Sequence, residues 1–381
     1  MSKLYNKYKI YLFLMTLLIV AFGTRVALAD GANFNVVPNL PENQISKNSG
    51  YFDLLMKPGE SQDLTIKLSN TTSKAITVDT TFSNATTADS GLAVYVPSTK
   101  PKDKSLVRDI SDYVTIDKQV KIPADSTVEV KAKVKMPEES FKGVMAGGFT
   151  FKQVESETDQ ANSSKKTSVT VKNEYRYVIA LVMRQSEESV APSLALNTVK
   201  ASQVNSRNVI QANLSNSAPA YLSQLNVSST VTSKTDSQLS YTYNNSAMQM
   251  APNSNFDLAI PVSKQGDLNG GTSAALKPGK YHLHLIAYGE KSTDGKYETT
   301  VDGNKVKYKY KWEFDKDFEV TSSEAEKLNK TDPTVEKQNF NWLIIIGIII
   351  IILLIILIFL LFKKRKKEDK EETKKDNHNF K

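Results

Sequence analysis

Alternation of apolar and polar residues is the feature that most limits what this chain can fold into. In STVEVKAKVKM, residues 126–136, apolar side chains occupy every second position and charged side chains stand between them. DLTIKLS (63–69) and NFDLAIPV (255–262) repeat the pattern. A period of two predicts strands that are buried on one face and solvated on the other, as in antiparallel sandwiches. No segment between the apolar ends of the chain shows a convincing helical period.

Proline-containing turns separate the predicted strands. Four of them each precede a strand: KPGE (57–60), PADS (123–126), APNS (251–254) and KPGK (277–280). Proline presets one turn angle, and Gly, Asn or Asp tolerates the other. The same pattern of a turn followed by a strand occurs in two segments, IPADSTVEVKAKV and MAPNSNFDLAIPV. The fold expected is therefore all-β, with two tandem immunoglobulin-like antiparallel β-sandwich domains at residues 30–190 and 191–322 and no helix longer than two turns between these limits.

The segment VESETDQANSSKKTS (154–168) has almost no apolar content. We interpret it as a long loop between two strands, GVMAGGFTFK and EYRYVIALVMR. An interdomain linker remains the alternative. After residue 322 the polar segment 323–341 is predicted to be a stalk.

Both ends of the chain carry targeting signals. Residues 1–29 combine a basic start, a short apolar run and the small-x-small site Ala27-Leu28-Ala29, which predicts a cleaved signal peptide, with an uncleaved anchor as the alternative. Residues 342–362 contain no charge and would span about 31 Å as a helix, the thickness of a hydrocarbon core. The basic run KKRKK opens the tail 363–381 and predicts a cytoplasmic side. We expect a single-pass type I membrane protein with its ectodomain outside.

Charge and cysteine content limit which classes of partner and which cellular location fit the sequence. The net charge of +8 belongs to the two ends, because subtracting the signal and the tail leaves 36 basic and 36 acidic residues in 30–341. Nucleic-acid binding therefore has no support. The chain has no cysteine, which for an exported protein favours a bacterial surface over an animal one.

Candidate catalytic groups are few. His282 and His284 share one face of a strand and could in principle share a metal, but Tyr281 and Leu283 claim the core face, so both histidines are expected in solvent. Asp89-Ser90-Gly91 matches the core of an aspartic protease motif but lacks the second carboxylate turn that this chemistry needs. We therefore predict no enzyme activity, no cofactor and no metal.

The strand YKYKWEFDKDFEV (308–320) places several aromatic side chains on one face. Trp312 and Phe314 are expected in the core. Tyr308 and Tyr310 could instead remain exposed as a binding surface, because aromatic residues supply most anchors at protein interfaces.

The chain resembles a known family in several stretches. VVPNLPENQ, GYFDLLMKPGESQDLTIKLSN and FSNATT are similar to the peptidoglycan-binding domain of the WxL-interacting proteins. RYVIALVMRQ, MQMAPNSNFDLAI, KPGKYHLHLIAYG and KWEFDKDFEV resemble that family's second domain. The resemblance implies a membrane-anchored surface protein of Gram-positive bacteria, set within the cell wall. Its first domain would contact peptidoglycan, and its second would bind a surface protein with Trp-x-Leu motifs, a motif that this chain itself lacks.

The resemblance also implies candidate site residues. For peptidoglycan these are Glu42, Asn43, Gln44 and Tyr51. For the WxL protein they are Tyr308, Tyr310, Met250 and Asn253. Two other function classes stay open: an adhesin that binds host glycan or protein, and a surface assembly chaperone, which would leave a long open apolar sheet edge.

Overall fold

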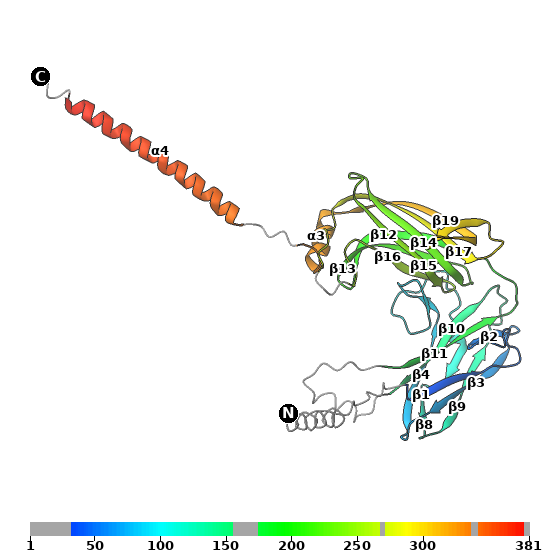
Figure 1. Ribbon diagram of the computed structural model, residues 1–381. Helices are drawn as coiled ribbons and strands as arrows, with labels where there is room; N and C mark the ends of the chain where they lie inside the picture. Colours follow the sequence, from blue (N-terminus) through cyan, green and yellow to red (C-terminus); the bar gives the residue numbers. More distant parts are fainter. Residues whose placement is uncertain (1–31, 155–173, 267–270, 337–341, 377–381) are drawn as a thin grey trace, which may run out of the picture.

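The computed structural model describes residues 32–154, 174–266, 271–336 and 342–376. Two β-sandwiches lie against each other at an angle, and a long C-terminal helix extends away from the second (Figure 1). The predicted all-β class is confirmed, since most of the described chain outside that helix forms strands in antiparallel sheets.

The first sandwich packs a four-stranded sheet on a five-stranded one around a core that runs from Phe34 to Met183. The four-stranded sheet has the order β1 (Phe34–Asn39), β3 (Ser61–Asn70), β9 (Thr127–Lys135), β7 (Val114–Ile116). The five-stranded sheet has the order β2 (Phe52–Leu55), β11 (Arg176–Arg184), β10 (Met145–Gln153), β4 (Ile76–Asn84), β8 (Gln119–Ile122). All these pairs are antiparallel except β2 with β11.

The second sandwich has its own core, from Leu194 to Ala325. Its smaller sheet has the order β12 (Leu194–Val204), β13 (Arg207–Asn216), β16 (Ser254–Pro261). Its larger sheet has the order β15 (Ser240–Met250), β14 (Leu222–Ser233), β17 (Gly279–Lys291), β19 (Asn304–Val320), β18 (Tyr297–Val301).

The alternating segments form strands as expected. On β9, Val130, Ala132 and Val134 are at most 4% exposed, and Ala132 faces Leu64 of β3 across the ladder. Three of the four proline turns form as predicted, each with one residue at positive φ: Gly59 (73°), Asp125 (47°) and Asn253 (48°). KPGK forms no turn, and its Gly279 (147°) begins β17. A residue with a β-branched side chain could not adopt these angles without strain.

Strands β10 and β11 are antiparallel neighbours, with Gly148 opposite Ala180. The segment interpreted as a loop therefore connects two adjacent strands of one sheet, although residues 155–173 themselves lie outside the described part. A second, longer connection leaves this sheet after β4. It contains β5 (Thr86–Thr87), β6 (Ala93–Val94) and the 3₁₀ turn η1 (Ile110–Tyr113).

The segment predicted as a polar stalk is mostly part of the second domain. Helix α3 (Ser322–Thr331) begins at a capping box in which Thr321 and Glu324 satisfy each other's backbone N–H groups. Asn329 donates to and accepts from the backbone of Leu276, and Asp332 is 1% exposed. The stalk prediction was wrong here because the segment's few apolar residues and its short polar side chains are used for docking and capping.

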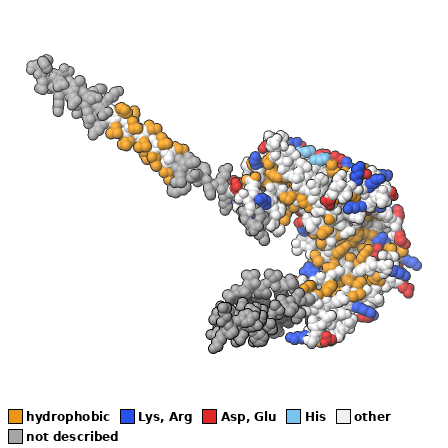
Figure 2. Space-filling view, viewed as in Figure 1, with side chains coloured by type: hydrophobic (Ala, Val, Ile, Leu, Met, Phe, Trp, Pro, Cys, Tyr) orange, Lys and Arg blue, Asp and Glu red, His pale blue; other side chains and the backbone are white. Residues whose placement is uncertain are grey.

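Helix α4 (Trp342–Asp376) contains the apolar run near the C-terminus. Within the described residues it is the one helix long and apolar enough, by length and composition, to cross a membrane. Hydrophobic side chains cover the described part of its surface (Figure 2). The predicted signal peptide lies outside the described residues.

Candidate binding surfaces and the domain junction

Gln44, predicted to contact peptidoglycan, is a structural residue. Its side chain is 4% exposed. The amide nitrogen donates to Ser46 O, Ser49 Oγ and Tyr51 O, and the amide oxygen accepts from Asp53 N at 3.0 Å. All of its hydrogen-bonding groups are therefore used within residues 44–53, and the buried side chain leaves no free group for the predicted wall contact.

The remaining residues of that prediction differ in how accessible they are. Glu42 is exposed, and Tyr51 is 38% exposed. Asn43 is half-buried and donates to Leu55 O and Gln62 Oε1. Glu42 and Tyr51 are thus free to meet a ligand, whereas Asn43 mainly fixes the end of β2.

A buried ion pair fixes β2 to β11 beside this loop. Asp53 is 6% exposed and lies 2.9 Å from Arg184 Nη2. Burial raises the pKa of the Asp53 carboxyl, and the neighbouring Arg184 opposes that rise. Such a pair holds the short parallel ladder in place and offers little to a ligand.

Two of the four residues predicted to bind a WxL protein lie in the core. Tyr308 and Met250 are both 0% exposed. The Tyr308 backbone is covered by the turn at Gly295, where an added Cβ would lie 2.6 Å from Tyr308. Neither side chain is exposed for the predicted contact: the turn at Gly295 lies over Tyr308, and Met250 packs into the second core.

The aromatic surface that remains is smaller than predicted. Tyr310 is half-buried and stacks on Trp312 with 5.7 Å between ring centroids. Trp312 and Phe314 pack against the second core, as expected, while staying half-buried. Tyr310 is therefore the one predicted aromatic contact that keeps accessible surface.

Asn253, the fourth predicted residue, lies where the two domains meet. Its side chain donates to Ser217 O of its own domain at 2.9 Å and to Ser105 O of the first domain at 3.2 Å. The structure therefore gives it a place between domains that the sequence did not reveal.

The domain junction is built from hydrogen bonds between buried groups. Thr87 of β5 accepts from Ala251 N at 3.0 Å and bonds Ser254 Oγ at 2.6 Å. Thr87 is 2% exposed and Ala251 0% exposed. Nearby, the hydroxyls of Tyr95 and Tyr221 lie 3.1 Å apart. Hydrophobic side chains also gather where the two domains meet (Figure 2).

The junction also depends on close backbone contact. Val144 N donates to Pro219 O at 2.8 Å. Gly143, at φ +80°, has no room for a side chain, because an added Cβ would lie 2.2 Å from Pro219 O. Together these contacts make the junction a defined interface.

A crevice of about 410 Å³ opens beside this contact. The first domain contributes the segments 105–108 and 140–146, and the second contributes 217–219 and 252–253. Arg108 lies over the ring of Phe141, 5.6 Å from its centroid. Sequence reasoning missed this site. The only signal was the apolar pair Leu106-Val107 within the otherwise polar stretch 98–109.

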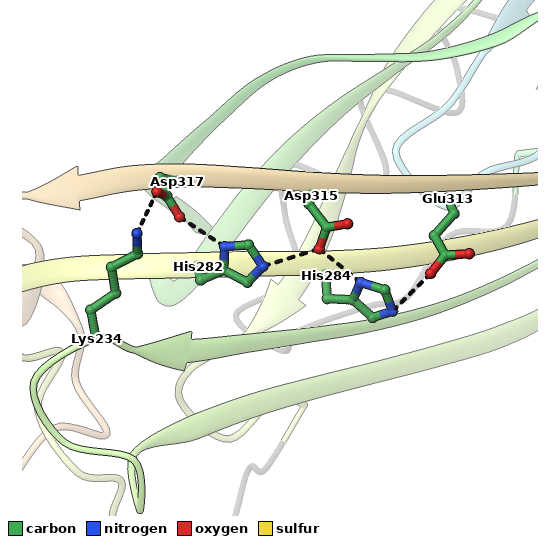
Figure 3. Close-up of polar contacts among 6 residues, drawn as sticks. All are labelled: Lys234, His282, His284, Glu313, Asp315 and Asp317. Atoms are coloured by element: carbon green, nitrogen blue, oxygen red, sulfur yellow. Dashed lines mark hydrogen bonds and ion pairs between the residues drawn. The ribbon is translucent and has the colours of Figure 1, made fainter.

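A row of charges follows β17 and β19 on the outer face of the second domain (Figure 3). His282 places Nδ1 2.8 Å from Asp317 Oδ1 and Nε2 3.0 Å from Asp315 Oδ1. His284 Nδ1 lies 2.9 Å from the same Asp315 oxygen, and Lys234 pairs with Asp317. Both histidines are 41% exposed, and Tyr281 and Leu283 are buried, as predicted.

The geometry of this row determines the protonation of His282. A carboxylate only accepts, so both ring nitrogens can donate only in the imidazolium form. The hydrogen bond to Asp317 raises the pKa of His282, and the bond to Asp315 adds to the effect. Within the described residues, no three His, Cys, Asp or Glu side chains are grouped to hold a metal ion. Alternation places Glu313, Asp315 and Asp317 on the solvent face, but only the register between β17 and β19 makes them partners of the histidines.

The Asp89-Ser90-Gly91 segment forms a turn, as expected. Asp89 pairs with Lys100 and accepts from Asp257 N, while Gly91 has φ +78°. Its carboxylate is used to hold the junction.

Comparison with protein families matches both sandwiches. Residues 34–153 match the model described as "WxL Interacting Protein, peptidoglycan binding domain", and residues 166–330 match "WxL Interacting Protein, host binding domain". The chain belongs to the WxL-interacting protein family. This WxL-interacting protein is therefore a binding protein of the cell surface. The second match includes β11, although β11 pairs with β10 in the first sandwich.

Comparison with other proteins adds little beyond the family. No curated protein shows significant sequence similarity. Among solved structures, the YadV chaperone is 12% identical over 74% of this chain and 100% of that one, with a TM-score of 0.28. The E. coli chaperone DraB is 12% identical over 71% and 95%, with a TM-score of 0.25. Likenesses this distant say nothing about function.

Proposed function

We propose that this protein connects the cell wall to a surface protein that carries Trp-x-Leu motifs. The first domain contacts peptidoglycan, and the second binds the WxL protein. The observation that carries the proposal is the match of the two family models, one to each sandwich. The hydrogen-bonded junction supports it, since it would hold the two binding units at a fixed angle.

We also propose that α4 anchors the protein in the cell membrane. Residues 337–341 separate the last described residue of the second domain from α4, and such a short segment reaches at most about 20 Å. The second domain would then stay near the membrane, and the first would face outward toward the wall. A 19-residue stalk would have allowed a much longer reach.

The accessible residues give each domain a candidate contact. In the first domain Tyr51 and Glu42 stand beside the loop that Gln44 organises. In the second, the half-buried ring of Tyr310 stacks on Trp312. Aromatic pairs with an indole or Leu-rich partner contribute about 0.5–1.5 kcal/mol beyond area burial.

Reciprocal variants of the full-length protein in detergent test this assignment. Tyr310→Ala should weaken capture of a WxL protein and leave sedimentation with purified wall unchanged. Tyr51→Ala should do the reverse, so each variant is the other's matched control. The assignment of roles would be contradicted if either variant lost both activities. It would also be contradicted if both variants kept both activities.

Binding of a host molecule by the second domain is a second candidate. It is favoured by the description of the matching model as a host binding domain. It predicts retention of the protein on host glycans or proteins, and that Tyr310→Ala reduces this retention.

We further propose that the protein has no hydrolase activity. Its two described histidines are engaged by carboxylates on an exposed strand, and Asp89 is paired with Lys100. Release of reducing ends or free stem peptides from purified peptidoglycan would refute this.

A further inference from the structure

The crevice at the domain junction has the size and position of a ligand site. Its volume of about 410 Å³ falls in the range of small-molecule and peptide pockets, which often lie between domains. Both domains supply its walls, so it exists only while the junction is closed. Neither family description assigns it a ligand.

The charge of the crevice points to an anionic ligand. Arg108 and Lys142 line it, and no Asp or Glu does among the described residues. Each cation has one carboxylate partner, Glu139 at 3.0 Å and Glu188 at 2.9 Å. Both partners are solvent-exposed, at 82% and 58%. Exposed pairs of this kind contribute only about 0–1 kcal/mol, so a ligand carboxylate could replace them.

The orientation of Arg108 argues against a sugar and for a peptide. Its guanidinium covers a face of the Phe141 ring at 5.6 Å, a face that a sugar would otherwise use for stacking. The ring instead holds the guanidinium ready for a bidentate carboxylate. Asn253 Oδ1 accepts no hydrogen bond from the described residues, which leaves it open to a peptide N–H. Val107, 79% exposed at the rim, suits a small apolar side chain.

We propose that this crevice binds a short peptide with a free carboxylate, and that in the cell wall this ligand is the stem peptide of peptidoglycan. The inference rests on the proposed function, since it takes wall binding as given and names the part that is bound. Arg108 and Lys142 hold the carboxylate, and the amide of Asn253 accepts from the peptide backbone.

The test uses the full-length protein in detergent and two wall preparations. One is intact peptidoglycan, and the other has its stem peptides removed by an amidase. The intact wall should retain the protein, and the stripped glycan should retain it at least about tenfold less. A soluble stem peptide should compete for binding, and its form with amidated carboxyl groups should compete poorly.

Variants test the residues. Arg108→Gln combined with Lys142→Gln should weaken retention on intact wall about tenfold or more, the equivalent of 1.4 kcal/mol. Val107→Glu, at an exposed rim position, should weaken it by adding a repelling charge. Lys104→Gln, on the same connection but outside the crevice, should bind like the parent protein.

The outcomes distinguish a failure of the stem-peptide inference from a failure of the proposed wall-binding function. Equal retention on stripped and intact wall would overturn the stem-peptide inference while leaving wall binding in place. Unchanged binding of both the double variant and Val107→Glu to intact wall would also overturn the stem-peptide inference. No retention on intact wall would instead remove the proposed function itself.

Discussion

Replacing Thr87 with Val should loosen the second domain, although Thr87 belongs to the first. Val has nearly the shape of Thr, so the change removes the hydroxyl and leaves the packing intact. Ala251 N then loses its acceptor at a position that is 0% exposed. Ser254 Oγ keeps a partner, because it also donates to Ala251 O at 2.8 Å.

The magnitude follows from the orphaned donor. A buried N–H without a partner costs about 1–3 kcal/mol. A loss near 2 kcal/mol in the free energy of unfolding, with a urea m-value of about 2 kcal/mol/M, lowers the unfolding midpoint by roughly 1 M. Trp312 is the only tryptophan before Trp342, so its fluorescence in the ectodomain reports unfolding of the second domain. The matched control is Thr242→Val, at an exposed position of β15, which should change the midpoint by well under half that amount.

The fluorescence midpoint decides whether the domains are coupled. A clear decrease for Thr87→Val, with no change in m, means that the junction stabilises both domains together. An unchanged Trp312 transition, while circular dichroism shows a destabilised first domain, would refute the description of the junction as a defined interface.

Other predictions follow from single sites. Tyr308→Ala should lower the free energy of unfolding by about 3–5 kcal/mol, as truncation of a buried aromatic does, measured by urea titration; a loss below 1 kcal/mol would mean the ring is not core. Gln44→Leu should destabilise the first domain by about 1–3 kcal/mol, because Asp53 N loses its acceptor; an unchanged midpoint would contradict its structural role. The bond to Asp317 raises the pKa of His282, so the protonated ring stabilises the folded state. This contribution to the free energy of unfolding is complete below about pH 6.5 and is lost as the pH rises through the folded-state pKa. Stability should therefore decrease as the pH rises above about 6.5 in the parent protein, and His282→Gln should remove that decrease; an identical pH profile for the variant would refute the role of the charge row.

The sheets were predictable because their signal is local. Alternation on β9 fixes which side chains are buried, and turn residues such as Asp125 fix where strands begin. The solvent position of His282 followed from the same alternation. Its carboxylate partners did not, because they come from the register between β17 and β19, which places His282 opposite Asp317.

The sites were less predictable because burial at the end of a strand depends on what folds over it. Tyr308 and Tyr310 share one face of β19, yet only Tyr308 is covered by the neighbouring turn. Gln44 looked like a free amide because three of its four partners are backbone groups, which carry no sequence signature. Asn253 and Arg108 come together only through the angle between the domains, and no pattern within either domain encodes it.

Co-sedimentation of three components tests the central claim most directly. Purified peptidoglycan is mixed with a WxL protein that does not itself sediment with the wall, with and without the full-length chain in detergent, and the WxL protein in the pellet is measured. We predict that it appears in the pellet only when the chain is present, and that Tyr310→Ala reduces the amount. If the chain sediments with the wall but leaves the WxL protein in the supernatant, it does not connect the two.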